Sequence, residues 1–179
     1  DWVGRTAAER TVARAGARKP PTGRYPVLYD ERIAAGLIGH LVAAVNGTAI
    51  VRGSSWLADA LGEEVLPKGL SLVEEPHRPR ASASRLFDGE GLPTETRPLV
   101  ADGTLVRWVL DLSTAKKLGL DSTANAARGT SAPPAPAAGN LRLTQGDASR
   151  DELLARMGTG LVVTSLIGAT INPTTGDYS

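Results

Sequence analysis

Apolar side chains at four-residue spacing predict one long helix near the start of the chain. They stand at Ile33, Leu37, Leu41 and Val45. The residues between them are mostly apolar too, so the apolar face covers nearly the whole circumference of the helix. Asp30 precedes the pattern and offers a side-chain oxygen to the free amides of the first turn. We therefore expect a buried central helix over about residues 30–46, nearly surrounded by protein.

Short runs rich in branched residues, bounded by turn residues, predict strands in the rest of the chain. The runs are Tyr25–Tyr29, Ala49–Arg52, Leu70–Glu75, Thr94–Val100, Leu105–Asp111, Leu141–Thr144 and Gly160–Ile171. Asp102-Gly103 joins two of these runs and is typical of a hairpin turn. Strands spaced and joined in this way are expected to pair antiparallel.

Short helices are predicted between the strands. One begins at Ser54, a second at Ser113 or Thr114, and a third at Ser149. Ser149 and Glu152 form a capping box, in which each side chain binds the other residue's backbone amide. Since strands dominate the second half and helices are segregated, we predict an α+β fold with mostly antiparallel strands, the buried central helix and short segregated helices.

The two remaining stretches differ in composition. Residues Asp1 to Arg18 combine many arginines with a thin apolar stripe, which predicts a basic helix that packs on a neighbouring domain. From Asp121 to Asn140 the sequence is rich in Ala, Pro, Gly, Ser and Thr, so we expect a long loop. Because the chain starts without a methionine and stops just after a strand-like run, we also expect it to be a fragment of a longer one.

Composition narrows the function classes. The chain has 179 residues, 41% of them hydrophobic and 22% charged, which is ordinary for a soluble globular protein. Its net charge of +1 disfavours nucleic acid and membrane surfaces as partners. Without cysteine, disulfides, Cys-ligated zinc and thiol catalysis are excluded, and His40 and His77 are too few for a histidine-rich metal site. With no apolar run of spanning length and no signal-peptide pattern, a cytoplasmic protein is expected.

His40 lies inside the apolar helix, where its polar ring needs a partner. One interpretation is a core histidine bonded to a backbone carbonyl. The other is a degenerate zinc-protease helix, since such helices place two histidines on successive turns with a glutamate beside the first to activate water. The positions five and four before His40 are Ala35 and Gly36, which can neither bind a metal nor accept a proton. We therefore predict no catalytic helix.

Asp88 and Glu90 are a second candidate pair. Two carboxylates this close could share acid/base chemistry. The glycines that flank them favour a tight turn with solvated acids instead. The two acids, together with Arg128 in the long loop, remain candidates for contact with a substrate or partner. His77 is expected in an exposed, proline-broken loop.

Several short segments, in one order along the chain, carry a resemblance. They are Ala35–Leu41, Leu72–Pro76, Phe87–Gly91, Ala115–Thr123, Met157–Thr164 and Thr175–Ser179. Together they resemble the TldD/PmbA family, historically called modulators of DNA gyrase, and within it the PmbA (TldE) branch. The resemblance implies that residues 1–22 are a linker or helix from a missing N-terminal domain. It also implies that residues 23–179 are the start and middle of a C-terminal domain whose last strands are missing.

The resemblance also bears on the helix. The TldD branch carries a His-Glu-Ala-x-Gly-His pattern, and placing its final Gly-His on Gly39-His40 puts the first histidine at Ala35 and the glutamate at Gly36. The family's third zinc ligand is a cysteine beyond Ser179. The resemblance therefore implies no catalytic residue and no metal in this subunit, with zinc expected in a TldD-like partner.

The function implied is that of a PmbA/TldE-like subunit of a cytoplasmic two-part metalloprotease, which degrades or matures small or unfolded peptides. Two alternatives remain open: a metallopeptidase active on its own, and a non-enzymatic regulatory binding protein of the gyrase-modulator type. The expected partners are a TldD-like zinc subunit and a peptide. A second copy of the fragment could also cover strand edges that it leaves exposed.

Overall fold

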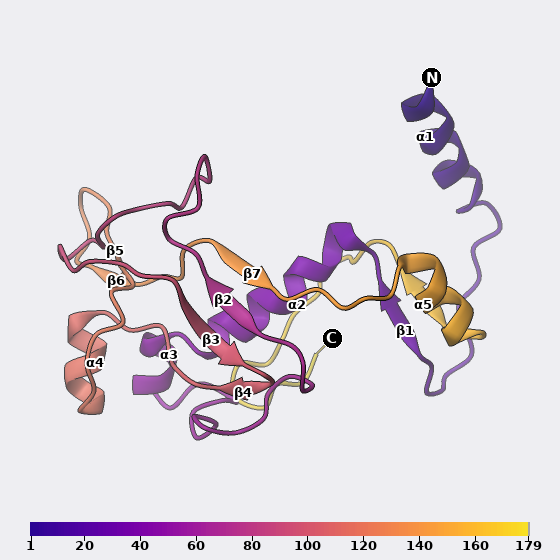
Figure 1. The fold of residues 1–179 in the computed structure, drawn as a ribbon. Coiled ribbons are helices and arrows are strands. Elements are labelled where there is room, and N and C mark those ends of the chain that lie inside the picture. The colour runs from indigo at the N-terminus through magenta and orange to yellow at the C-terminus, as the bar shows by residue number, and fades with distance from the viewer. Residues whose placement is uncertain (179) are drawn as a thin grey trace.

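The computed structural model describes residues 1–178 and has an α+β architecture, as predicted (Figure 1). Ser179, the last residue of the Thr175–Ser179 segment, lies outside the described residues. The helices are α1 (Trp2–Val12), α2 (Glu31–Ala44), α3 (Gly47–Val51), α4 (Leu112–Leu118) and α5 (Arg150–Met157). The strands are β1 (Val27–Tyr29), β2 (Leu72–Glu74), β3 (Arg97–Ala101), β4 (Thr104–Leu105), β5 (Ala126–Ala127), β6 (Ala135–Pro136), β7 (Leu141–Leu143) and β8 (Leu161–Val163).

A four-stranded antiparallel sheet in the order β4-β3-β2-β7 forms the centre of the molecule. The predicted Asp102-Gly103 turn joins β3 to β4, with Ala101 opposite Thr104. Gly103 has φ 84°, and a Cβ there would stand 2.5 Å from the Leu66 carbonyl oxygen. Only glycine fits this turn, because a side chain would meet both the backbone strain and the neighbouring segment.

The hydrophobic core lies where the C-terminal end of α2 packs on the sheet. Leu41 and Val45 are buried there against side chains of β2, β3 and β4. The sheet contributes Leu72, Leu99, Val100 and Leu105. Each such side chain, once buried, stabilises the fold by about 1.5–3 kcal/mol.

The N-terminal half of α2 departs from the expected burial. Ala35, Gly36 and Gly39 are exposed, and a Cβ built on either glycine would meet nothing within 4 Å. The prediction of a helix nearly surrounded by protein is therefore wrong for this half. The periodicity gave the helix correctly, but the buried residues of the helix begin only at Leu41.

Two predictions for the segment directly after α2 are wrong, and of the strand predicted over Leu105–Asp111 only Leu105 lies in a strand, β4. The predicted strand Ala49–Arg52 is part of α3, because the Asn46 side chain caps this helix by accepting from the Thr48 amide (2.9 Å). Burial of Ile50 in the core then outweighs the strand preference of branched residues. The helix predicted from Ser54 is a series of turns, since the Ser55 hydroxyl donates to the Ala44 carbonyl (2.6 Å).

Near the two ends of residues 1–178, one pair of strands forms, whereas the first helix stays apart from the sheet. β1 pairs in parallel with β8, and α5 begins at the predicted Ser149–Glu152 capping box. Of the strand predicted over Gly160–Ile171, only β8 forms. α1 has no buried residue and stands apart from the sheet in Figure 1. Among residues 1–178, no helix is long and apolar enough to cross a membrane.

We predict that Gly47→Ala destabilises the protein whereas Gly36→Ala does not. A Cβ at Gly47 would meet the Thr114 hydroxyl at 2.7 Å, Leu110 at 2.8 Å and the Val109 carbonyl at 2.9 Å. Overpacking of this kind costs about 1–3 kcal/mol. In the open helix position of Gly36, alanine should instead stabilise by about 0.5–1 kcal/mol. Urea denaturation of both variants measures the difference, and equal effects would contradict the placement of α3 against α4.

Candidate functional site

A groove runs along the exposed half of α2. Its other wall is β7 and the segment that follows it, and its volume is about 1240 Å³. The apolar side of the groove includes Ala34, Ala35, Ile38, Gly39, Leu141 and Leu143. Glu31 and Arg150 also line it, which adds one charge of each sign. A long, largely apolar groove with few polar groups suits an extended chain better than a small charged ligand.

The strand beside this groove has a free edge. On its inner side β7 pairs with β2: the Glu75 amide donates to the Asn140 carbonyl (2.8 Å) and the Thr144 amide donates to the Ser71 carbonyl (2.9 Å). Bonded and non-bonded pairs alternate along an antiparallel ladder, so the backbone groups of Leu141 and Leu143 point away from β2. Within residues 1–178 they find no other strand.

The opposite edge of the sheet, at β4, already has hydrogen-bond partners. The Leu105 amide of β4 donates to the Glu63 carbonyl (2.9 Å), and the Gly62 amide donates back to the Leu105 carbonyl (2.8 Å). This segment before β2 therefore covers the β4 edge. Among residues 1–178, the sheet therefore offers backbone hydrogen bonds to a further strand on the β7 side and not on the β4 side.

The three degenerate motif positions lie on α2 beside the groove. Ala35 lines the groove, Gly36 is exposed, and His40 is half-buried with its ring edge-on to the Tyr178 ring at a centroid distance of 5.5 Å. The His40 ring forms no hydrogen bond in the part of the chain that the structure describes. The interpretation of His40 as a core histidine bonded to a backbone carbonyl is therefore wrong. A methyl group and a hydrogen at the first two positions do not fit a zinc ion.

The His40 contact brings together two of the segments that carry the resemblance. Tyr178 belongs to the Thr175–Ser179 segment, and the chain before it is held by a bond from the Trp56 amide to the Pro173 carbonyl (2.8 Å). Gly176 lies so close to the Trp56 ring that a Cβ would stand 3.1 Å from it. Across residues 1–178, no three His, Cys, Asp or Glu side chains are grouped to hold a metal ion.

The predicted turn around Asp88 forms, but its acid is not solvated. Asp88 is 3% exposed and its carboxylate accepts three backbone amides, from Glu90 (2.9 Å), Leu92 (2.9 Å) and Ala126 (3.0 Å). The first two bonds close the turn, and the third ties it to β5. Asp88 is therefore a structural anchor, and the expectation of a solvated side chain is wrong for it.

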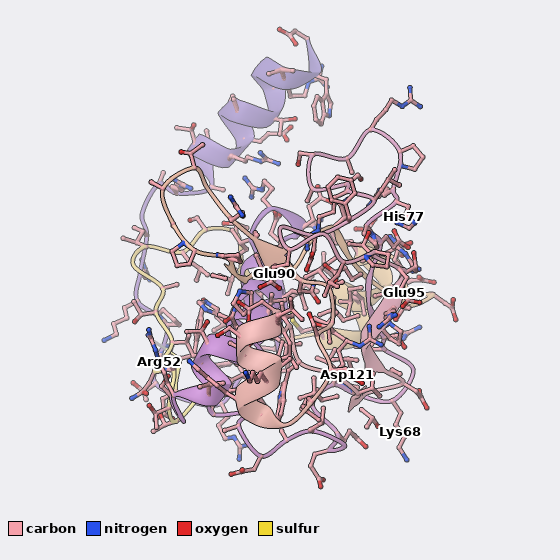
Figure 2. The ribbon with its side chains drawn as sticks, turned by 90° about the vertical axis from the view of Figure 1, so that its left-hand side faces the viewer. Arg52, Lys68, His77, Glu90, Glu95 and Asp121 are labelled. Carbon is pink, nitrogen blue, oxygen red and sulfur yellow. The ribbon has the colours of Figure 1, made fainter. Side chains whose placement is uncertain are left out.

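Glu90 also serves the backbone. Its carboxylate accepts from the amide of Leu112 (2.9 Å), the first residue of α4, where a negative charge is favoured by the helix dipole. Figure 2 shows Glu90 at one end of α4 and Asp121 away from it. Arg128 is exposed on the segment after β5 and forms no ion pair among the described residues. Acid/base chemistry by Asp88 and Glu90 has no support, because both are engaged by amides.

A buried polar cluster was missed from the sequence. Glu74, only 5% exposed, accepts two contacts from the Asn125 side-chain amide (2.9 and 2.8 Å) and one from the Gly139 backbone amide (2.5 Å). These bonds hold the folded 121–140 segment, including the β5–β6 ribbon, against the sheet. The sequence pattern that could have indicated this cluster is the alternation of side chains along β2, which puts Glu74 on the same buried face as Leu72.

Electrostatic shifts are few. Burial lowers the pKa of Arg107, the neighbouring Arg97 lowers it further, and Glu74 acts in the opposite direction. The side-chain hydrogen bond from Arg32, together with its backbone amide, lowers the pKa of Asp30 at the start of α2. These named neighbours account for both shifts, and neither shift by itself indicates a catalytic centre.

Comparison with solved structures gives the class of fold. The structure is similar to a putative modulator of DNA gyrase from Bacteroides thetaiotaomicron, with a TM-score of 0.85, 32% identity, and coverage of 98% of this chain and 38% of that chain. It is also similar to TldE from Thermococcus kodakarensis, with a TM-score of 0.81, 25% identity, and coverage of 97% and 40%.

Sequence comparison gives the family. The model of the PmbA/TldA metallopeptidase C-terminal domain matches residues 22–179, and the chain belongs to this family. It is 41% identical over its whole length to the metalloprotease PmbA of Escherichia coli O157:H7, of which it covers 38%. It is 39% identical over 99% of its length to the PmbA homologue of Haemophilus influenzae, again covering 38%. The chain thus spans well under half the length of these relatives, and the resemblance seen in the sequence is confirmed.

We predict that Asp88→Ala lowers the free energy of unfolding by about 3 kcal/mol, because three buried amides lose a charged acceptor. The matched control is Asp121→Ala, at an exposed carboxylate without a hydrogen bond among the described residues, which should change stability by less than about 0.5 kcal/mol. Urea denaturation tests both. A loss below about 1 kcal/mol for Asp88→Ala would contradict its role as an anchor.

Proposed function

We propose that this chain is part of a PmbA/TldE-like subunit that lacks its own zinc motif and pairs with a TldD-like zinc subunit in a cytoplasmic metalloprotease for small or unfolded peptides. The observation that carries the proposal is α2: Ala35 and Gly36 stand on its uncovered side, where the resembled motif has histidine and glutamate. A zinc peptidase needs both a ligand set and a group that activates water. This helix keeps the scaffold and supplies neither group.

The subunit contributes binding rather than chemistry. Within residues 1–178 the β7 edge offers outward amides and carbonyls at Leu141 and Leu143, and the apolar groove beside it accepts alternate side chains. Adding a strand to such an edge recognises an extended backbone with little regard to its side chains. This mode suits unfolded peptides, because a folded substrate has already paired its own backbone groups.

We predict that the full-length protein purifies without stoichiometric zinc, binds a TldD-like subunit, and has no peptidase activity alone. The assembled pair should cleave unfolded peptides, and a chelator should abolish the cleavage because the zinc belongs to the partner. Metal analysis, co-purification and a peptide-cleavage assay with each subunit alone and together measure these outcomes. Tight stoichiometric zinc in the isolated protein, with chelator-sensitive cleavage, would instead establish an enzyme active on its own.

The double variant Ala35→His, Gly36→Glu is a control for the same proposal. Both positions are exposed and a Cβ at Gly36 meets open space, so the variant should fold. It should remain inactive alone, because two groups on one helix do not complete a zinc site. Cleavage by the isolated variant would show that the missing histidine and glutamate alone account for the lack of peptidase activity.

We predict that blocking alternate backbone amides of a peptide weakens its binding to the protein. A strand added at β7 directs every second amide to the edge, so N-methylation of that set should weaken binding about tenfold per amide. N-methylation of the intervening set is the matched control and should have little effect. Calorimetry with the two peptide sets measures this, and equal effects would rule out strand addition.

A further inference from the structure

Two large apolar side chains stand in solvent at adjacent positions between β2 and β3. Leu86 is 74% exposed and Phe87, the only phenylalanine of the chain, is 65% exposed. We call this pair the 86–87 prong. Single exposed apolar residues are common on protein surfaces. The prong differs from them because the backbone on both sides of it is fixed by hydrogen bonds.

The prong is held on its first side by Arg85 and on its second by Asp88. The Arg85 amide donates to the Pro76 carbonyl (2.8 Å), and its guanidinium donates to the carbonyls of Ala126 (3.4 Å) and Ala137 (3.2 Å). The Asp88 carboxylate closes the following turn. Arg85 and Asp88 thus use their polar groups to fix the backbone on either side of the exposed pair.

The backbone of the prong itself has partners. The Leu86 carbonyl accepts from the Thr94 amide (3.1 Å), and Phe87 forms a bridge with Pro93. An extended peptide would find few free backbone groups here, unlike at β7. The prong therefore offers side chains for recognition, and a preorganised aromatic side chain is the usual anchor of a protein–protein contact because little conformational freedom is lost on binding.

The charges near the prong that lack a partner among the described residues are cationic. Arg78 and Arg80 lie in the same excursion, and Arg128 lies beside Gly89, whose Cβ position is 3.3 Å from the Arg128 side chain. In the described chain none of these three arginines has an ion-pair partner. Of the acids close to the prong along the chain, Asp88 and Glu90 are taken up by backbone amides. Glu95, next to the Thr94 that bonds Leu86, pairs with Arg97. A partner surface that complements the prong is apolar at its centre and carboxylate-rich at its rim.

We propose that the 86–87 prong docks into an apolar pocket edged by carboxylates on the partner subunit, with Arg128 contributing to the rim of the contact. This inference rests on the proposed pairing with a zinc subunit and names the surface that does the pairing. The residues proposed for the contact are therefore Leu86, Phe87 and Arg128, and the acids Asp88 and Glu90 are not among them.

The test uses the full-length protein and its zinc subunit, with association measured by calorimetry. Phe87→Ala and Leu86→Ala should each weaken association about tenfold or more and leave the melting temperature of the isolated protein unchanged. Leu120→Ala, at another exposed leucine, is the matched control and should leave the affinity unchanged. Arg128→Glu should also weaken association, with an effect that shrinks as salt is added. Arg52→Glu, at the exposed C-cap of α3, should not.

Three results would overturn the inference, and they separate it from the proposed function. Full association of both prong variants would refute the prong while leaving the pairing intact. A lowered melting temperature of the isolated Phe87→Ala protein would show that its own chain covers the prong. Unchanged association with weaker peptide capture by the assembled pair would assign the prong to the substrate. Failure of the wild-type subunits to associate would refute both proposals.

Discussion

The packing of one end of α2 on the antiparallel sheet is the contact on which the rest of the structure depends. Leu41 and Val45 meet Leu72, Leu99 and Leu105 there, and this cluster is the main apolar core of residues 1–178. Because the contact involves only the second half of the helix, the first half stands free beside β7. The groove is a direct consequence: a core at one end of a long helix leaves an apolar surface at the other.

Three acids fix the loops around this core. Glu74 ties the 121–140 segment to β2, Asp88 ties the 86–92 turn to β5, and Glu90 caps α4. Each carboxylate accepts amide protons that lack a partner in a helix or sheet, and for the buried Glu74 and Asp88 this offsets the cost of burying the charge. Chain segments without regular secondary structure thereby acquire one defined position, and this is what makes exposed residues on them useful for recognition.

Local features of this fold could be predicted from the sequence, whereas pairing could not. The Ser149–Glu152 capping box, the Asp102-Gly103 turn and the α2 periodicity depend on residues a few positions apart, and each forms. The failures depend on tertiary contacts. The Ala49–Arg52 run lies in α3 and its C-cap because burial of Ile50 and the contact with α4 outweigh its strand preference. The exposed half of α2 could not be foreseen either, since an apolar helix shows that cover is needed but not whether this chain provides it.

The candidate site shows the same division. The residue types at positions 35, 36 and 40 could be read directly, because a missing ligand is visible without a structure. The roles of Asp88 and Glu90 could not, since an acid between glycines has the same sequence whether it faces solvent or a neighbouring amide. The two proposed recognition surfaces lie on different parts of the molecule and differ in chemistry. As proposed, the β7 edge would bind a peptide through backbone groups, and the prong would bind the partner through side chains with a cationic rim. Salt screens the arginine rim far more than it weakens backbone hydrogen bonds. Ionic strength should thus separate association through the prong from capture of a peptide at the edge, even in the intact protein.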